Sequence, residues 1–326
     1  TGMMEPVYVV LLGFLIDLAL GDPSWMPHPV VYIGKLISLC EKYLRKAFPK
    51  TEKGEFTAGI FLTIIVIGIA TILPYCILLW ADYINPWLKY MLEVFWCWQI
   101  FAAKSLGQAA KKVGDEIGRN DIQGARKYLS YIVGRDTQDL DFKQIVKAVC
   151  ETVAENTSDG IIAPMFYLLI GGVPMGFFYK AGNTLDSMVG YKSERYINFG
   201  KASAIFDDIL NFIPARITGF VMCMAAFICG LDGKNAFRIF FRDRKNHVSP
   251  NAGNPESACA GALRVQLLGD ASYFGEIYKK KTVGDPLKEI EGSDIKKTNI
   301  LMYVTAILSL ILTTGVRTLI FIYIVR

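Results

Sequence analysis

The sequence predicts an all-α, polytopic integral membrane protein with about four to six membrane helices, some of them broken or re-entrant, and with helical cytoplasmic segments. Two observations lead to this class. The 326 residues are 52% hydrophobic although 20% are charged. The apolar residues also fall into long blocks, with most charged residues between them. Because about 20 apolar residues suffice to cross a bilayer as a helix, we expect the chain to cross it several times.

Six segments are candidate membrane helices. Residues 57–80 contain no charged side chain, and residues 300–325 are interrupted only by Arg317. Segment 6–20 is shorter, and it lacks the basic n-region and small-residue cleavage site of a signal peptide. The weaker candidates are 6–20, 86–103, 160–179 and 209–231.

The distribution of basic residues predicts an orientation. If all six segments cross the membrane, 21–56, 102–159 and 232–299 lie on one side and carry most of the 35 Lys and Arg residues. The positive-inside rule then places these three segments in the cytoplasm.

Segment 180–208 would then lie outside, although it is densely polar. The preceding segment, 160–179, is interrupted by several helix-breaking residues, and 209–231 begins with polar ones. Broken helices at membrane depth are tolerated where they line a protein cavity. We therefore expect 160–216 to fold inward as a re-entrant unit, with simple spanning helices as the alternative. The interrupting residues are Pro164, Gly171, Gly172, Pro174, Gly176, Asn211, Pro214 and Arg216.

The chain is interpreted as one domain, because no internal repeat or low-complexity run separates parts of it. Thr1 and Gly2 precede Met3 and are interpreted as a cloning remnant, so the domain is predicted to cover 3–326. The seven cysteines are scattered without a CxxC pair, and there are only two histidines. A disulfide framework or a transition-metal site is therefore not expected, whereas a hard cation held by carboxylates remains open.

Between the apolar blocks, three helices are predicted at 107–117, 121–133 and 141–156. On the third, Lys147, Glu151 and Glu155 follow one another at intervals of four and share a face, and Asp159 comes one turn later. Such spacing is typical of a solvated, salt-bridged face. It is also compatible with a carboxylate cluster for Mg²⁺ and a nucleotide phosphate.

Six sequence blocks are long and unusual. They are GDPSWMPHPVVYIGKLI (21–37), ARKYLSYIVGRDT (125–137), ETVAENTSDGIIAPMFY (151–167), YKAGNTLDSMVGYK (179–192), DDILNFIPAR (207–216) and SPNAGNPESACAGAL (249–263). Together they resemble the adenosylcobinamide-phosphate synthase family of cobalamin biosynthesis, known as CobD/CbiB, and they occur in the family's order over essentially the whole chain. One departure is His247-Val248, where the family pattern has His-Pro.

The resemblance implies an enzyme in the cell membrane whose active site faces the cytoplasm. It would join adenosylcobyric acid to (R)-1-aminopropan-2-ol phosphate, or a close amino-alcohol phosphate, in an amide bond made with ATP and Mg²⁺. The expected partners are these substrates and the lipid bilayer; a homo-oligomer is compatible with the sequence, and no nucleic acid is expected.

The residue chemistry fits such a reaction. No GxxxxGK[ST] motif is present, so phosphate binding would fall to Arg, Lys and backbone amides. Glu151, Glu155 and Asp159 are the predicted Mg²⁺ ligands. The predicted catalytic residues are Glu151, Glu155, Asp159, Asp186, Asp207 and Asp208. The predicted substrate- and phosphate-binding residues are His28, Arg135, Asn156, Lys180, Asn183, Lys192, Asn211, Arg216, Asn251 and Glu256.

Several of these residues have a simpler interpretation. His28 could make only a turn hydrogen bond, and Asn251 to Glu256 could be an ordinary helix start with Pro in its first turn. Arg216 is expected to pair with Asp207 or Asp208. The aromatic clusters at 95–101 and 177–179 are interpreted as interface anchors, with corrin stacking as the alternative.

Two other functions were weighed. CDP-alcohol phosphotransferases need an Asp-Gly pair two residues before an Ala-Arg pair, but here Gly124 directly precedes Ala125-Arg126. A membrane transporter or binding subunit for corrinoids could use the same broken helices. It would differ from the synthase in ATP turnover.

Overall fold

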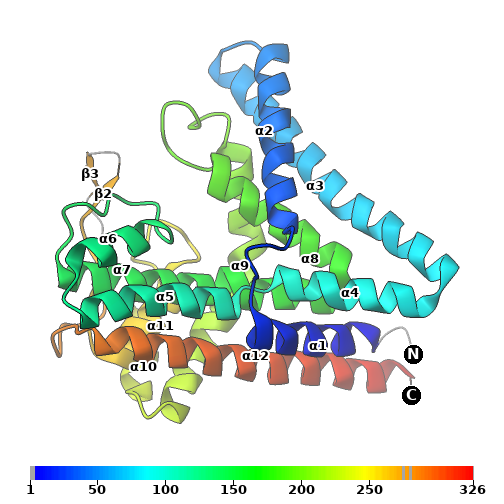
Figure 1. Cartoon of the computed structure of the whole chain (residues 1–326). Helices are drawn as coiled ribbons and strands as arrows, with labels where there is room; N and C mark the ends of the chain where they lie inside the picture. Colours follow the sequence, from blue (N-terminus) through cyan, green and yellow to red (C-terminus); the bar gives the residue numbers. More distant parts are fainter. Residues whose placement is uncertain (1–3, 274–275, 279–280, 326) are drawn as a thin grey trace. The chain divides into compact units, whose positions relative to one another are not determined.

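The chain is almost entirely helical in the computed structural model, which describes residues 4–273, 276–278 and 281–325 (Figure 1). The predicted all-α membrane class is confirmed. The sequence did not indicate two short antiparallel strand pairs, which are β1 (Leu267–Leu268) with β4 (Thr282–Val283) and β2 (Ala271–Tyr273) with β3 (Glu276–Tyr278).

The chain folds into two compact units, each assembled from separated stretches of sequence. Unit 1 comprises Thr1–Ala102, Ala163–Asn211 and Thr313–Arg326, and unit 2 comprises Ala103–Ile162 and Phe212–Leu312. The boundary therefore falls within two long helices, α9 (Lys201–Ile228) and α12 (Ser293–Val325). The prediction of a single domain over 3–326 stays a prediction.

Unit 1 is a helical assembly in which α1 packs on α4, and α3 packs on both α2 and α8. Helix starts follow local chemistry. His28 and Thr51 accept hydrogen bonds as N-caps of α2 and α3, and proline opens α2 and α4. The helices are α1 (Glu5–Leu20), α2 (Pro29–Ala47), α3 (Glu52–Ile84), α4 (Pro86–Ile100) and α8 (Ala163–Val189).

Helix α8 is broken, as its sequence predicted. Gly171 and Gly172 leave helical geometry, and Gly172 adopts φ 68°, which glycine tolerates best because it has no Cβ. Upstream, α7 (Phe142–Thr157) leads into α8 through one turn of π-helix, Ser158–Ile162. Such π-turns occur frequently at functional sites. This turn, which contains Asp159, was not predicted from the sequence.

Unit 2 is built around α7 and α11. All residues of α11 are buried, and most of its side chains are small. A Cβ on Gly261 would lie 2.7 Å from both the Ala236 Cα and the Asn235 carbonyl oxygen, so only glycine permits this approach of α11 to α10. The remaining helices are α5 (Ala103–Gly118), α6 (Ile122–Ser130), α10 (Gly233–Asp243) and α11 (Gly253–Leu263).

Four helical stretches of the described residues are long and apolar enough to cross a membrane. They overlap four of the six segments predicted from the sequence. The other two segments form α1 and α4, which have 16 and 15 residues and are shorter than a typical span of about 20. The four stretches are Glu52–Ile84, Phe142–Val189, Lys201–Ile228 and Ser293–Ile324.

The crossing of α4 can be tested with two exposed lysines. Lys50 precedes α3 and Lys112 follows α4, so if α3 crosses, the two lie on one side only if α4 crosses as well. We predict that a cysteine at either position, in a background without other cysteines, resists impermeant thiol reagents in intact cells. Labelling of one position alone would show that α4 does not cross. Permeabilised cells supply the control, because both positions should then react.

Candidate functional site

The predicted site residues fall into two groups, one in each unit. Each unit has a polar centre with its own geometry. Unit 1 contains His28, Lys180, Asn183, Asp186, Lys192, Asp207, Asp208 and Asn211. Unit 2 contains Arg135, Glu151, Glu155, Asn156, Asp159, Arg216, Asn251 and Glu256.

In unit 2, the Glu151 carboxylate joins three parts of the chain. Its Oε2 lies 2.6 Å from Arg135 Nη2, and its Oε1 accepts a hydrogen bond of 2.7 Å from the Leu268 backbone N–H. Lys147, one turn earlier on α7, donates to the Leu268 carbonyl at 3.0 Å. Leu268 has φ 60°, which is uncommon for a residue other than glycine. We call Arg135, Lys147, Glu151 and Leu268 the Glu151 cluster.

These contacts correct both interpretations of the charged face of α7. Glu151 is only 2% exposed, so this part of the face is not solvated. Both of its oxygens bind protein groups, which leaves it poorly suited to be a Mg²⁺ ligand. Within the described residues, Glu151, Glu155 and Asp159 do not form a three-carboxylate metal group, nor do any other three His, Cys, Asp or Glu side chains.

The residues after Glu151 are less enclosed. Glu155 and Asn156 in the last turn of α7, and Asp159 in the π-turn, are half-buried. The Asn156 amide donates to the Thr152 carbonyl at 3.0 Å. Their predicted roles in binding substrate or metal stay predictions.

In unit 1, α8 and the first part of α9 hold an aspartate cluster, defined as Asp186, Asp207 and Asp208 with Asn183 and Asn211. Asp207 is 8% exposed. Its Oδ2 accepts from the Asn211 amide at 3.0 Å, and its Oδ1 accepts from the Asn183 amide at 3.4 Å. Asp186 and Asp208 are close enough to interact electrostatically with Asp207. Lys192 likewise lies within electrostatic range of Asp208.

A buried tyrosine orients this cluster, and sequence reasoning missed it. The Tyr179 hydroxyl donates to Asn211 Oδ1 at 2.8 Å, and its ring stacks on Tyr167 with centroids 5.2 Å apart. Tyr179 lies one turn before Asn183 on α8, and this spacing within the YKAGN motif was the available signal.

The chemistry of the aspartate cluster favours a positively charged ligand. Three carboxylates near one another repel unless protons or a cation compensate them. Amide groups fix the orientation of Asp207 without neutralising it. The cluster can therefore attract an ammonium group or a divalent cation, with further ligands from a bound substrate.

His28 makes the turn hydrogen bond that was the simpler of its two interpretations. Its Nδ1 accepts from the Val30 N–H at 3.2 Å, so it caps α2, and its Nε2 lies 3.8 Å from Asp22 Oδ1. Burial lowers the pKa of the His28 imidazole; Asp22 opposes this effect, and the positive charge of Lys180 adds to it. A neutral imidazole is the form that can accept the capping bond.

Around α11, the contacts differ from the two alternatives predicted from the sequence. Arg216 donates to Asn251 Oδ1 at 3.3 Å and to the Phe212 carbonyl at 2.6 Å, in place of the expected aspartate partner. The buried Glu256 carboxylate has its Oε2 3.9 Å from His247 Nε2. The Ser249 hydroxyl accepts from the N–H groups of residues 251 and 252 just before the helix.

Sequence comparison places the chain in a known family. The family described as CobD/Cbib protein matches residues 10–302. The chain belongs to the CobD/CbiB family. A "Cobalamin biosynthesis protein CobD" of Geobacter metallireducens is 46% identical over 317 residues, which are 97% of this chain and 98% of the relative.

Two further CobD/CbiB relatives match over similar lengths. A protein of the same name from Clostridium perfringens is 46% identical, over 94% of this chain and 97% of its own length. A "Cobalamin biosynthesis protein CbiB" of Salmonella typhimurium is 42% identical, over 94% of this chain and 96% of its own length. No solved structure matches the chain.

The chain still forms a local turn at His247-Val248, where this CobD/CbiB sequence departs from the family pattern. His247 Nδ1 accepts from the Ser249 N–H at 2.9 Å, across Val248, which is 66% exposed. Valine in place of the expected proline therefore does not prevent the turn that precedes α11.

Removal of Glu151 tests whether its carboxylate holds unit 2 together. Glu151→Ala should lower the free energy of unfolding by about 3–5 kcal/mol, because it leaves a largely buried ion pair without one partner. Thermal unfolding in detergent, followed by circular dichroism, measures this loss. Lys143→Ala is the matched control, because Lys143 and Glu289 form an exposed pair whose loss should leave stability nearly unchanged. Equal effects of the two substitutions would contradict this role.

The lowered pKa of His28 predicts a pH dependence of stability. The folded protein binds fewer protons at this imidazole than the unfolded chain, so stability is complete above the unfolded pKa of about 6.5 and falls as the pH decreases through it. His28→Asn keeps a capping acceptor but cannot titrate. Between pH 7 and pH 5, the unaltered protein should lose more stability than this variant, by up to about 1.4 kcal/mol per pH unit. Parallel stability profiles would refute the assignment.

Proposed function

We propose that this CobD/CbiB-family protein is an adenosylcobinamide-phosphate synthase. It would join a carboxylate of adenosylcobyric acid to the amine of (R)-1-aminopropan-2-ol phosphate, or of a close amino-alcohol phosphate, in an amide bond that consumes ATP. Family membership supports the pathway, and the aspartate cluster is the observation that carries the reaction class.

The aspartate cluster suits an amine substrate. Aminopropanol phosphate carries an ammonium group at neutral pH, and the three carboxylates would attract it. The ammonium must lose a proton before nitrogen can attack an activated carboxyl carbon. Asp207 is assigned as the base that accepts this proton, because Asn183 and Asn211 hold its two oxygens in a fixed orientation.

The oxygen donors of this cluster also fit Mg²⁺. This cation is usually held by one or two carboxylates together with substrate phosphates, so a ready-made group of three is not required. Asp186 and Asp208 are assigned to it, and Glu155 and Asp159 stay candidate ligands of a cation within unit 2. Magnesium would neutralise the charge of the ATP phosphates.

Basic side chains would bind the phosphates. Lys180 and Lys192 are assigned to the phosphate of the amino alcohol, so that its binding energy orients the amine. Arg135 is assigned to nucleotide phosphate, and Glu151 acts on it as a positioning residue through the 2.6 Å ion pair. Asn156, Arg216, Asn251 and Glu256 remain assigned to substrate binding.

The enzyme would work at the cytoplasmic face of the cell membrane. ATP is a cytoplasmic substrate, and the predicted orientation places the basic segments on that side. Exclusion of water would be essential, because water hydrolyses an activated acyl group.

The reaction itself can be tested with purified protein in nanodiscs. With adenosylcobyric acid, aminopropanol phosphate, ATP and Mg²⁺, mass spectrometry should detect the amide product. Asp207→Asn should lower kcat/KM by about a hundredfold or more, the usual contribution of a general base. The variant keeps the side-chain shape, so size-exclusion chromatography should show a folded protein.

Asp115→Asn is the matched control, because Asp115 is exposed and pairs only with Lys111 among the ion pairs of the described residues. It should retain full turnover. Corrinoid uptake into vesicles without amide product would favour the transporter alternative, for which the broken α8 is the only structural argument. Full activity of Asp207→Asn would remove the aspartate from its assigned role.

A further inference from the structure

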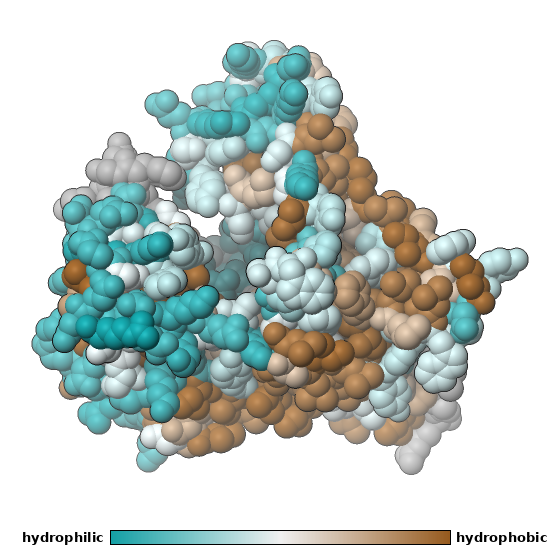
Figure 2. Space-filling view, viewed as in Figure 1, coloured by the Kyte–Doolittle hydropathy of each residue, from teal (hydrophilic) through white to brown (hydrophobic). Residues whose placement is uncertain are grey.

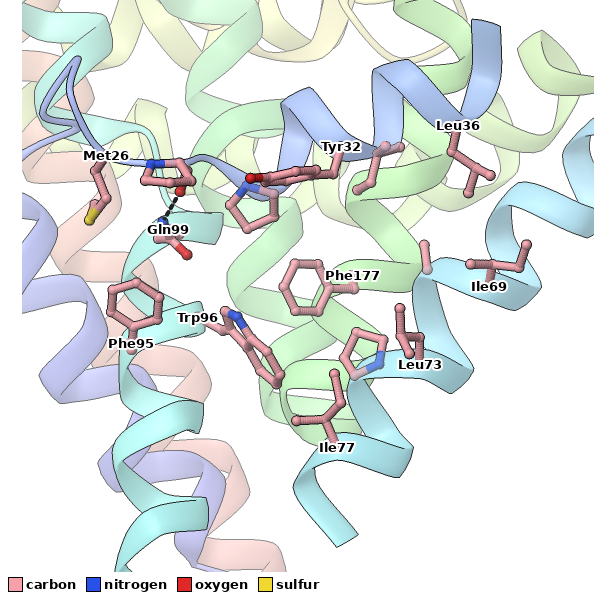
Figure 3. A pocket seen from close by; sticks show the side chains of 15 residues that line it. Met26, Tyr32, Leu36, Ile69, Leu73, Ile77, Phe95, Trp96, Gln99 and Phe177 are labelled. Atoms are coloured by element: carbon pink, nitrogen blue, oxygen red, sulfur yellow. Dashed lines mark hydrogen bonds between the residues drawn. The ribbon is translucent and has the colours of Figure 1, made fainter. Parts of the chain in front are cut away.

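Unit 1 contains a cavity of about 550 Å³ that is separate from the aspartate cluster in its lining residues (Figure 3). Its walls come from four helices of the unit. Tyr32 of α2, Leu73 and Ile77 of α3, Trp96 of α4 and Phe177 of α8 all line it. A volume of this size lies within the usual range of ligand sites, about 300–1,000 Å³.

The lining is almost wholly apolar. None of the described side chains that line the cavity is charged, and the amide of Gln99 donates to the Pro27 carbonyl at 2.8 Å. Trp96 and Phe177 form an edge-to-face pair with ring centroids 5.7 Å apart. A corrin with its amide groups, or a nucleotide with its phosphates, would lose hydrogen bonds to water here without replacement. The lining therefore favours a hydrocarbon ligand.

The position of the cavity along α3 indicates where such a ligand comes from. Its α3 residues, 69–77, lie near the middle of the candidate span Glu52–Ile84. The middle of a spanning helix lies in the hydrocarbon core of the bilayer. Met26, Pro27 and the α2 residues of the lining belong to segment 21–56, which is predicted to be cytoplasmic, so the cavity reaches from the core toward the cytoplasmic surface. Leu73 lines the cavity and is still 56% exposed, so the cavity is open rather than sealed. Figure 2 shows that apolar side chains continue over the outer surface along α3.

We propose that this cavity binds one acyl chain of a membrane lipid. The chain would enter beside α3 and contact the Trp96–Phe177 pair, which provides a rigid apolar surface between α4 and α8. A chain bound there fills an apolar space that offers water no hydrogen-bond partners. The bound acyl chain would thus pack against helices of unit 1 while it remains part of the bilayer. This role does not depend on the proposed reaction.

A photoreactive lipid tests this assignment. The full-length protein is placed in nanodiscs of phosphatidylcholine with a small share of the same lipid carrying a diazirine on one acyl chain. After illumination, peptide mass spectrometry should find the lipid attached to Trp96 or Phe177. Leu73→Trp, which fills the cavity, should reduce this labelling about tenfold. The reason is that roughly two methylene groups of the acyl chain would lose their burial, which weakens binding by about that factor.

Ile72→Trp is the matched control. Ile72 is adjacent, 61% exposed and outside the cavity lining, so labelling of Trp96 and Phe177 should persist in this variant. Equal labelling in both variants, or none at these residues in the unaltered protein, would overturn the proposal. Competition by adenosylcobyric acid would overturn it too, by assigning the cavity to the corrinoid. Because the readout is labelling, these outcomes are distinguishable from failure of the proposed reaction.

Discussion

The burial of the Glu151 carboxylate is the constraint on which unit 2 depends. A charge this deeply buried must be paired, and its two oxygens are satisfied by Arg135 from one loop and by the Leu268 N–H from a strand far along the chain. Lys147 completes the attachment at the Leu268 carbonyl. One face of α7 therefore fixes two segments that have little secondary structure of their own, and it presents Arg135 in a defined position.

Unit 1 is organised by a polar network of a different kind. Tyr179, Asn211, Asp207 and Asn183 connect α8 to α9 through side-chain hydrogen bonds, and the stacked ring of Tyr167 covers the tyrosine. Neutral amides hold the carboxylate here, so its charge is oriented without being cancelled. The pairing of Glu151 with an arginine stabilises structure, whereas the uncompensated Asp207 suits a bound cation.

Apolar and polar sites are kept apart within unit 1. The aspartate cluster uses α8 after its glycine break and the start of α9, whereas the apolar cavity uses α2, α3, α4 and Phe177. Substrates that form hydrogen bonds would thus bind at the aspartate cluster, and an acyl chain would bind in the apolar cavity. This separation follows from the physics of burial, because a polar group without a partner is unfavourable in the cavity and a methylene group is unfavourable in water.

The sequence by itself determined the helical class, the apolar segments, the break at Gly171-Gly172 and the family, because these depend on local composition, periodicity and motifs. It also singled out Glu151, Asp186, Asp207 and Asp208, which the structure places in the two polar clusters, but it did not indicate their partners. Only the tertiary structure decided that Glu151 binds Arg135 and Leu268, and that Tyr179 orients Asn211. The partners of a buried charge are set by contacts between residues far apart in sequence, and i, i+4 spacing carries no information about them. The π-turn at Asp159 adjoins α7, and the β1–β4 pair packs on α7 and α11, so these features likewise depend on tertiary contacts.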